Sequence, residues 1–321
     1  MLKVGIPEAV QPDLYRLFPK DIALEVIPFQ PNRSYDIDFW IVPPWTHQAH
    51  QVWPWLRGVR VVQATVAGVD GILSLIPKDV LFCDARGSHS IPTAEWAVAA
   101  VLGALKYLPL YADVQRAGIW ARRKEGEARY QILHPSQPKL YPTVLCEELH
   151  GRQVLIVGYG DIGRAIEARL LPFGVEIVRV ARTAREGVHG VEKLMELLPA
   201  ADAVILIVPF TSETIGLMGA EQIARMKQGA LLVNAARGPV VDTNALLAAL
   251  YEGRIQAAID VTDPEPLPDG HPLWSAPNLL ITPHIAGSTP MFMRRAMEFA
   301  AAQVGRYLRG EPLENQVVGE Y

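Results

Sequence analysis

The sequence has little cysteine, no long uninterrupted hydrophobic run and no surplus of basic residues. Its two cysteines, Cys83 and Cys146, lie far apart and outside any C-x-x-C pair, which excludes a disulfide scaffold and a cysteine-type zinc site. The longest purely apolar run, residues 203–210, is far too short for a membrane span, and the N-terminus lacks the apolar core of a signal peptide. We therefore expect a soluble, cytoplasmic protein that does not enter a membrane.

An excess of one charge is also missing. The 30 Lys and Arg residues face 34 Asp and Glu, a net charge of −4, whereas nucleic-acid-binding domains usually carry a basic surface. The one basic cluster, residues 122–124, is followed by Glu125 and Glu127, a pattern typical of a solvated surface. His47 and His50 have no evident third partner for a metal ion. The sequence thus predicts neither a nucleic-acid partner nor a bound metal.

Hydrophobic material and alternating elements are abundant. Half of the 321 residues are hydrophobic, which suffices for about two packed domains. Strand-like and helix-like segments alternate almost throughout, which predicts an α/β fold with parallel sheets covered by helices. In the first hundred residues the expected strands are 2–6, 23–28, 38–42, 59–64 and 80–83. After residue 151 they are 153–157, 175–180, 203–208, 230–234, 257–261 and 279–282.

Three further segments bear on the organisation of the chain. An Ala-rich apolar helix is expected from about Pro92 to residue 105, buried between the domains, and a last helix at 291–308. Residues 111–150 have few periodic apolar positions and contain three prolines, which predicts an extended arm or long loop. Because such long loops are uncommon without a function, we expect this arm to contact a second subunit.

The first strand after residue 151 leads into a glycine-rich turn with the pattern G-x-G-x-x-G. Its context, a buried strand before it and a helix after it, is the one that a dinucleotide-binding turn requires. The first glycine would permit the tight turn, the second the approach of a pyrophosphate, and the third close packing of helix on strand. Glycines that merely turn a strand into a helix are the alternative, which this context disfavours. The turn comprises Gly158, Tyr159, Gly160, Asp161, Ile162 and Gly163.

The end of the next strand distinguishes the two nicotinamide dinucleotides. An NAD site usually has Asp or Glu there, bonded to the ribose 2′-OH, but this chain has Ala181. Arg182 and Arg185 can bind a 2′-phosphate, and Thr183 can donate a hydrogen bond to it. We therefore expect NADP to be preferred, with NAD as the alternative. A solvated Arg-Thr loop would explain the arginines but not the missing acid.

Charged side chains follow three later strands. Arg237 comes after strand 230–234, Asp260 and Glu265 end and follow strand 257–261, and His284 comes after strand 279–282. Because ligands bind outside the carboxyl ends of such strands, these side chains should share one crevice with the nicotinamide. His284 would exchange a proton with a carbonyl that receives hydride, Glu265 would orient its ring, and Arg237 would bind a carboxylate. Singly each has an ordinary structural explanation, but together they predict an active site.

These motifs resemble those of the D-isomer-specific 2-hydroxyacid dehydrogenases. The resemblance covers essentially the whole chain and is strongest from Gly151 to about Pro290. It implies two Rossmann-like domains, a doubly wound dinucleotide-binding domain inserted into a flavodoxin-like substrate domain. The segments that carry it are 149–152 (LHGR), 209–214 (PFTSET), 226–238 (MKQGALLVNAARG), 265–267 (EPL) and 282–287 (TPHIAG).

The resemblance also implies a domain division and residue roles. The substrate domain would comprise residues 1–98 and 287–321, and the dinucleotide-binding domain residues 99–286, with 111–150 as the dimerisation arm of a homodimer. Arg237, Glu265 and His284 would be catalytic. The cofactor would contact Gly158, Tyr159, Gly160, Asp161, Ile162, Gly163, Ala181, Arg182, Thr183, Arg185, Pro209, Thr214, Ala235, Ala236, Asp260, His284 and Gly287. The substrate would contact Val66, Ala67, Gly68, Arg237, His284 and Ser288, with the backbone N–H groups of residues 66–68 binding its carboxylate.

Departures from the family's patterns narrow the substrate. Ala64 and Thr65 stand where phosphoglycerate dehydrogenases tend to have an arginine, and Glu265 stands where formate dehydrogenases have glutamine. The segment 181–183 is similar to that of NADPH-using glyoxylate/hydroxypyruvate reductases. We therefore expect hydride transfer from NADPH to a small 2-keto acid. A phosphoglycerate-dehydrogenase-like enzyme and a dinucleotide-sensing binding protein or corepressor of the same fold are the alternatives.

Overall fold

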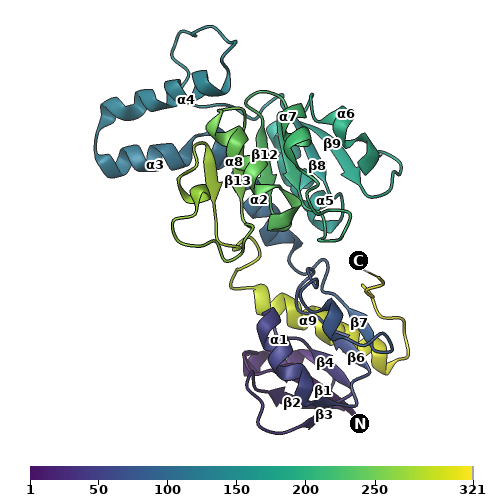
Figure 1. Ribbon diagram of the computed structural model, residues 1–321. Helices are drawn as coiled ribbons and strands as arrows, with labels where there is room; N and C mark the ends of the chain where they lie inside the picture. Colours follow the sequence, from purple (N-terminus) through teal and green to yellow (C-terminus); the bar gives the residue numbers. More distant parts are fainter. Residues whose placement is uncertain (320–321) are drawn as a thin grey trace. The chain divides into compact units, whose positions relative to one another are not determined.

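The chain folds into two α/β units, which the computed structural model describes over residues 1–319 (Figure 1). The first unit comprises Met1–Ser90 and Ser288–Tyr321, and the second comprises Ile91–Gly287. The sequence placed the first boundary after residue 98 instead of residue 90. That position falls inside helix α2 (Ser90–Leu105), whose Ala94, Ala97 and Val101 are buried in a core of the second unit. The helix therefore belongs to the second unit along almost its whole length.

A parallel sheet organises the first unit. Its order, β2-β1-β4-β6-β7, corresponds to the 2-1-3-4-5 order of flavodoxin-like sheets. The strands are β1 (Leu2–Pro7), β2 (Ile22–Ile27), β4 (Phe39–Ile41), β6 (Val61–Gln63) and β7 (Leu81–Cys83), and β3 (Tyr35–Asp36) pairs separately with β5 (Leu56–Arg57). The helical elements are η1 (Pro12–Leu17), α1 (Thr46–Val52), η2 (Trp53–Trp55), η3 (Leu73–Leu75) and α9 (Phe292–Leu308).

Alternate residues of these strands fill two cores. Phe39 and Ile41 pack in a cluster that includes the buried face of α9, whereas Trp40 and Val42 pack in the cluster that includes α1. This alternation follows from the two-residue repeat of a strand. Because α9 comes from the far end of the chain, the sheet of the first unit is covered only when residues 288–308 join residues 1–90.

The second unit is built on a longer parallel sheet, whose order is β10-β9-β8-β11-β12-β13-β14. Its first six strands in that order reproduce the 3-2-1-4-5-6 arrangement of dinucleotide-binding folds, so the predicted fold class is confirmed. The strands are β8 (Gln153–Val157), β9 (Glu176–Ala181), β10 (His189–Gly190), β11 (Ala203–Leu206), β12 (Leu231–Asn234), β13 (Gln256–Ile259) and β14 (Leu279–Ile281).

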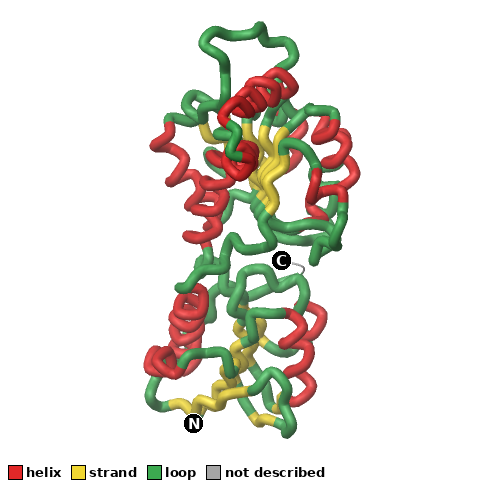
Figure 2. Tube along the Cα trace, turned by 90° about the vertical axis from the view of Figure 1, so that its left-hand side faces the viewer, coloured by secondary structure: helices red, strands yellow, loops and turns green. Residues whose placement is uncertain are grey.

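Helices cover both faces of this sheet (Figure 2). Val154 and Ile156 of β8 pack with α2 and α5 (Asp161–Leu170), whereas Leu155 and Val157 face the opposite core. Strands buried on both faces are uninterrupted hydrophobic runs, as the sequence shows. The opposite core contains residues of α6 (Leu194–Leu197), α7 (Ala220–Arg225) and α8 (Thr243–Tyr251), and the short helical turns are η5 (Leu171–Phe173), η6 (Val191–Lys193), η7 (Gly238–Val240) and η8 (Pro272–Ser275).

The predicted arm differs from the expectation of a loop. It contains most of α3 (Leu108–Ala117), all of η4 (Trp120–Lys124) and all of α4 (Glu125–Leu133), and residues 118–119 and 134–150 are without helix or strand. The loop prediction was therefore wrong for most of residues 111–133. The physical reason is that α3 has no buried residue within the described chain, so its apolar side chains do not mark it as a helix that covers a core.

A buried carboxylate fixes the base of this arm. Glu147 accepts hydrogen bonds from Tyr107 Oη (3.0 Å), His134 Nε2 (3.1 Å), Arg152 Nη2 (2.6 Å) and Gln256 Nε2 (2.8 Å). Burial alone would raise the pKa of Glu147, but the hydrogen bond from His134 and the charge of Arg152 outweigh it and hold this pKa at about 2. The ionised carboxylate thus joins α4 and the chain before β8 to the first residue of β13.

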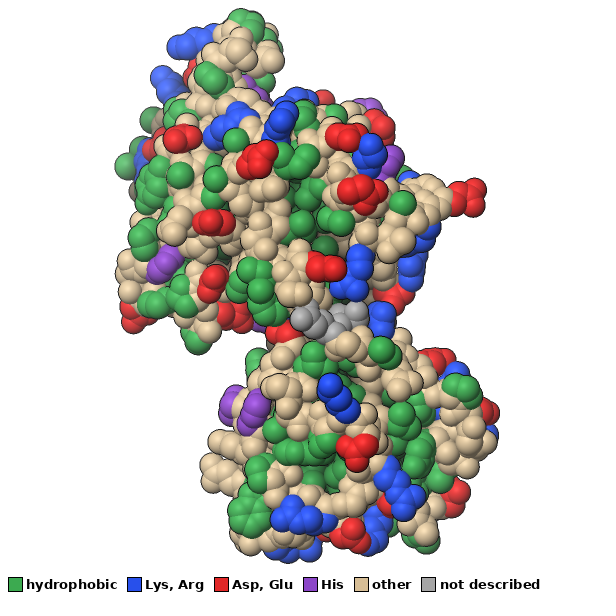
Figure 3. All heavy atoms as spheres, turned by 45° about the vertical axis from the view of Figure 1, so that its right-hand side comes forward, with side chains coloured by type: hydrophobic (Ala, Val, Ile, Leu, Met, Phe, Trp, Pro, Cys, Tyr) green, Lys and Arg blue, Asp and Glu red, His purple; other side chains and the backbone are tan. Residues whose placement is uncertain are grey.

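The surface carries interspersed charges. On the face shown in Figure 3, acidic and basic side chains lie among one another, in keeping with the near balance of the composition. Within residues 1–319, no single helix is long and apolar enough to cross a membrane. Only α2 and α3 taken together, which are bent by 62° at the break between them, reach the required length and composition.

Candidate active site

The glycine turn after β8 has the shape that a pyrophosphate needs. Gly158 has a φ of +102°, and a Cβ there would lie 2.5 Å from the carbonyl oxygen of Ile207. A Cβ on Gly163 would lie 3.0 Å from the carbonyl oxygen of Gly158, which shows how closely α5 approaches the turn. A Cβ on Gly160, in contrast, would meet no atom of residues 1–319 within 4 Å. The turn is therefore tight on the protein side and open above Gly160.

The N-terminus of α5 completes this turn. Its first helical hydrogen bond runs from the Arg164 N–H to the Gly160 carbonyl at 3.0 Å, so the N–H groups of residues 161–163 precede the hydrogen-bond ladder. No side chain of the described chain caps this end. Free N–H groups and the positive end of the helix dipole suit a phosphate. The residues present thus fit a dinucleotide.

Two arginines stand beside the end of β9, which closes with Ala181. Arg182 Nε lies 3.1 Å from Glu213 Oε2, and both side chains are more than half exposed. Arg185 Nη2 donates to the carbonyl oxygen of Tyr159 at 2.5 Å. Thr183 is exposed. Glu213 was not predicted as a partner of Arg182, because the sequence cannot show which side chain of the loop after β11 faces the loop after β9.

Tyr159 of the turn is held from its other side. Its hydroxyl donates to Glu167 Oε2, and Arg179 Nε donates to the same oxygen at 2.7 Å. The hydrogen bond from Arg179 lowers the pKa of Glu167 despite its burial. This ionised pair positions the tyrosine ring, and neither partner was predicted from the sequence.

His284 and Glu265, which the sequence predicted to act together, are joined by a hydrogen bond. His284 Nδ1 lies 2.6 Å from Glu265 Oε1, with side chains that are 48% and 40% exposed. The hydrogen bond with His284 holds the pKa of Glu265 below its usual value, and the charge of Arg237 acts in the same direction. Arg237 Nη1 donates to its neighbouring carbonyl, Ala236 O, at 2.9 Å. The chain at His284 has a φ of +53°, an uncommon conformation for a residue other than glycine.

Asp260 is the anchor of the turn that carries His284. It is 2% exposed and accepts hydrogen bonds from Thr282 Oγ1 (2.6 Å), Ile285 N (2.9 Å) and Ala286 N (2.8 Å). Thr282 Oγ1 in turn accepts from Trp96 Nε1 at 3.0 Å, which links the turn to α2. A carboxylate offers about four lone-pair sites, so three protein donors leave room for one more. Thr282 and Trp96 were not predicted, since neither carries a charge.

The remaining predicted cofactor residues lie in loops after strands of the same sheet. Thr214 Oγ1 donates to the Pro209 carbonyl at 2.8 Å in the loop after β11. Ala235 and Ala236 follow β12, where Ala236 N donates to Asn234 Oδ1 at 3.0 Å. Gly287 is the last residue of the second unit. All strands of this sheet are parallel, so these loops share its carboxyl edge.

The predicted substrate loop belongs to the first unit. Val66, Ala67 and Gly68 follow β6 and are half-buried, and Ser288 is exposed. A cavity of about 30 Å³ lies against this loop, with Thr65, Val66 and Gly68 on one side and the segment 42–46 on another.

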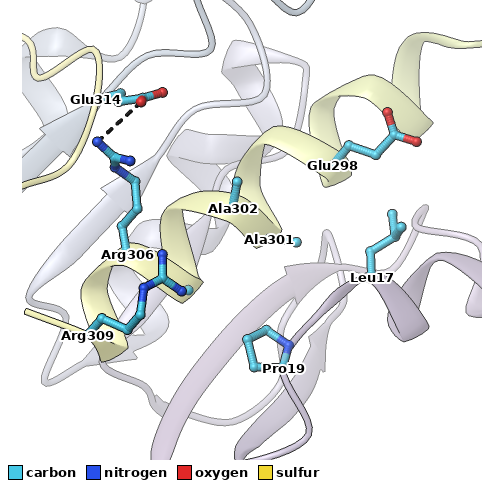
Figure 4. Close-up of a pocket in the computed structure, with 9 residues that line it drawn as sticks. Leu17, Pro19, Glu298, Ala301, Ala302, Arg306, Arg309 and Glu314 are labelled. Carbon is cyan, nitrogen blue, oxygen red and sulfur yellow. Dashed lines mark ion pairs between the residues drawn. The ribbon is translucent and has the colours of Figure 1, made fainter. Parts of the chain in front are cut away.

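A larger cavity of about 410 Å³ also lies within the first unit, between α9 and the segment with Leu17 and Pro19 (Figure 4). Its two arginines are paired with acids: Arg306 with Glu314 at 3.2 Å, and Arg309 with a glutamate of the following turn at 2.8 Å. The positive charge around this cavity is thus compensated within the protein. Among the described residues no group of three or more His, Cys, Asp and Glu side chains has the arrangement of a metal site.

A Rossmann-type sheet, an open glycine turn and an Arg–Glu–His group define a class of protein, the nicotinamide-dinucleotide-dependent oxidoreductases. Comparison with known proteins gives the family. The model of the D-isomer specific 2-hydroxyacid dehydrogenase NAD binding domain matches residues 98–286. The chain therefore belongs to the D-isomer specific 2-hydroxyacid dehydrogenases, and the family predicted from the sequence is confirmed.

Individual relatives agree with this assignment. The chain is 32% identical over 291 residues to a D-3-phosphoglycerate dehydrogenase of Methanocaldococcus jannaschii, covering 88% of this chain and 52% of that protein. It is 43% identical over 171 residues to a glyoxylate reductase of Thermofilum pendens, covering 51% of this chain and 50% of that protein. The matched regions thus span about half the length of these curated relatives. A D-isomer specific 2-hydroxyacid dehydrogenase from Xanthobacter autotrophicus Py2, solved with NADPH and MES, is 29% identical, covers 99% of this chain and 100% of its own, and has a TM-score of 0.75.

Proposed function

We propose that the protein is a reductase of small 2-keto acids of the glyoxylate/hydroxypyruvate class, with NADPH as the preferred hydride donor and His284 as general acid and base. One observation carries the proposal. Glu265 and His284, which are joined by a hydrogen bond of 2.6 Å, follow β13 and β14 of a dinucleotide-binding sheet. The charge of Arg237 helps to lower the pKa of Glu265. A histidine oriented by a carboxylate at such an edge suits proton exchange with a substrate.

The residues divide the chemistry as follows. When bound, the nicotinamide supplies the hydride that adds to the carbonyl carbon. Because Glu265 occupies Nδ1 of His284, the other nitrogen of the ring, Nε2, gives its proton to the carbonyl oxygen, and a hydroxyl results. Arg237 binds the carboxylate of the acid and polarises the carbonyl. The N–H groups of Val66–Gly68 bind the carboxylate from the first unit. In the oxidative direction His284 takes the proton back.

The NADP preference rests on the end of β9. Ala181 supplies no carboxylate at the end of β9, and Arg182 and Arg185 follow it, with Arg182 paired to Glu213 of the loop after β11. Thr183 adds an exposed hydroxyl. The Xanthobacter relative, which was solved with NADPH, supports the same choice.

We also propose that the chain forms a homodimer through residues 111–150. Large apolar side chains of this arm are exposed, among them Ile119, Trp120 and Tyr141, and exposed apolar surface of this kind favours association. Light scattering on the wild type and on Trp120→Asp measures the mass directly. A wild-type monomer would refute this part of the proposal. The cytoplasmic location and the lack of a nucleic-acid partner stay predictions of the sequence.

A phosphoglycerate-dehydrogenase-like activity is the second candidate. The match to the Methanocaldococcus protein over 88% of this chain favours it, whereas Ala64 and Thr65 offer no positive charge for a phosphate. The two candidates separate when oxidation of NADPH and NADH is followed with glyoxylate, hydroxypyruvate and 3-phosphohydroxypyruvate. Faster turnover of the phosphorylated acid would establish the second candidate and refute the first.

The same assay tests the role of His284. His284→Ala should lower kcat by about 10²–10⁴-fold, the usual contribution of a general acid, with little change in the Kd of NADPH. Wild-type protein that binds a dinucleotide but turns over none of these acids would instead support a dinucleotide-sensing binding protein. If His284→Ala lost dinucleotide binding together with activity, His284 would be structural.

A further inference from the structure

We propose that His89 is a positioning residue for the acid-binding loop. By holding the carbonyl of Thr65, it aims the backbone N–H groups that follow toward the carboxylate of the substrate. The inference deepens the proposed function and rests on it, because it concerns how the loop Val66–Gly68 recognises a 2-keto acid. All the residues involved belong to the first unit.

The contact that carries the inference is buried. His89 is 8% exposed, and its Nε2 lies 2.9 Å from the carbonyl oxygen of Thr65, which is 1% exposed. A carbonyl can only accept, so Nε2 carries the hydrogen. Burial lowers the pKa of His89, the hydrogen bond with Thr65 raises it, and the charge of Arg295 lowers it, with a net decrease. The ring is therefore a neutral, fixed donor.

Because the peptide group is planar, the hydrogen bond to the Thr65 carbonyl also fixes the direction of the Val66 N–H group. In a trans peptide the C=O of one residue and the N–H of the next point to opposite sides. The Thr65 carbonyl is held by His89, and the Val66 carbonyl accepts from Ala85 N at 3.0 Å. The N–H of Val66 therefore points away from His89, and the N–H of Ala67 points away from Ala85. Neither donates to a protein acceptor within residues 1–319, so both are available to an anionic ligand.

A second contact fixes the plane of the histidine ring. His89 stacks on Phe292, the first residue of α9, with ring centroids 4.3 Å apart and an interplanar angle of 7°. Stacking restricts rotation of the imidazole and keeps Nε2 directed at Thr65. The first α9 residue thus supports the loop through His89. The sequence offered no sign of this arrangement, since His89 lies in no recognised motif.

Three variants separate the hydrogen bond from the packing. His89→Phe keeps a ring that can stack on Phe292 but removes the N–H donor. His89→Gln removes the ring but keeps a donor amide, and Phe292→Leu keeps apolar volume but removes the stack. Both residues belong to the first unit, whereas the dinucleotide turn belongs to the second. The measurements are kcat and KM for the best keto acid, the Ki of oxamate (a carboxylate that is not reduced) and the Kd of NADPH.

The expected result is a selective loss of carboxylate recognition. His89→Phe should raise KM and the oxamate Ki by roughly 5–20-fold, the loss typical of one hydrogen bond that orders a buried group, while the Kd of NADPH stays unchanged. His89→Gln should restore part of the loss, and Phe292→Leu should give a smaller increase.

The outcomes distinguish the inference from the proposed function. Wild-type protein that neither reduces a keto acid nor binds oxamate would refute the proposed function and this inference with it. An active wild type with unchanged KM and Ki in His89→Phe would overturn the inference alone. A variant that loses only stability or kcat, with unchanged Ki, would also overturn it and make His89 a packing residue. If His89→Phe does not fold, the oxamate Ki of His89→Gln decides. A Ki equal to that of the wild type supports hydrogen-bond donation by residue 89. A Ki so high that oxamate no longer inhibits refutes it.

Discussion

Replacing Arg182 by alanine should weaken the binding of NADPH far more than that of NADH. Under the proposed function the guanidinium binds the 2′-phosphate, and a hydrogen bond to a charged group contributes about 1.5–3 kcal/mol. In the structure Arg182 is paired with Glu213 at 3.1 Å, with side chains that are 54% and 68% exposed. A pair so exposed contributes about 0.2–1 kcal/mol. The 2′-phosphate must displace Glu213 from Arg182. The free energy of the lost Arg182–Glu213 pair is therefore subtracted from that of the new Arg182–phosphate interaction.

The difference is about 1–2 kcal/mol, which corresponds to roughly 5–30-fold in Kd. Arg182→Ala should therefore raise the Kd of NADPH by that factor and leave the Kd of NADH almost unchanged. Glu213→Gln is the matched control. It removes the competing carboxylate and should tighten NADPH by up to about 5-fold, the equivalent of 1 kcal/mol, again without an effect on NADH.

Titration of nicotinamide fluorescence at fixed ionic strength measures the Kd of both dinucleotides for the wild type and for each variant. Salt must be held constant because it screens exposed charges. Equal weakening of both dinucleotides in Arg182→Ala would refute phosphate recognition by this residue. A Glu213→Gln variant with lower NADPH affinity would show that the two side chains do not compete.

Two further predictions concern buried polar groups. Glu147 has a native pKa of about 2 against an ordinary value of 4.5, so its stabilisation, on the order of 3 kcal/mol, is complete above pH 4.5 and is lost as the pH falls toward 2. Urea unfolding at pH 7, 4 and 3 should therefore show a weaker pH dependence in Glu147→Gln than in the wild type, and parallel curves would contradict this. Thr282→Val should cost about 1–3 kcal/mol of unfolding free energy, because Trp96 and Asp260 each lose a partner. Thr282→Ser keeps the hydroxyl, so equal urea midpoints for the two variants would disprove the argument.

The strands were predictable because they are buried on both faces. Parallel strands inside an α/β sheet are near-continuous hydrophobic runs, and runs such as residues 154–157 can be recognised directly in the sequence. The eleven expected strands all form, with ends within two residues of those observed. The two-residue strands β3, β5 and β10 were missed, since two residues cannot display a period or a run.

The arm shows the opposite case. Helix α3 buries no residue within the described chain, so its apolar side chains do not identify a helix that covers a core, and it was taken for part of a loop. Trp120 and Tyr141 are exposed there. Sequence patterns identify a helix by the apolar face that it packs on a core. A helix whose apolar side chains face outward packs on no core of its own chain, so this signal is missing.

The candidate site was predictable where chemistry requires charge. His284 and Glu265 stand out in the sequence because they and Arg237 follow successive strands of one dinucleotide-binding sheet, and the structure joins His284 and Glu265 at 2.6 Å. The supporting residues were not predictable. Thr282 and Trp96 are neutral, and their contacts with the Asp260 turn depend on how α2 packs. The substrate roles assigned to residues 66–68 and Ser288 stay predictions.

The discontinuity of the first unit has a consequence for biosynthesis. Its core contains Val4, Ile6 and Phe39, yet it is closed by Ala296, Ala300 and Val304 of α9. Ribosomes add about 5–20 residues per second, so the first ninety residues wait roughly 10–45 s for the helix that covers their sheet. The whole second unit, Ile91–Gly287, is synthesised before the first residue of α9. The second unit can therefore complete its core while the first unit still lacks the helix that covers its sheet.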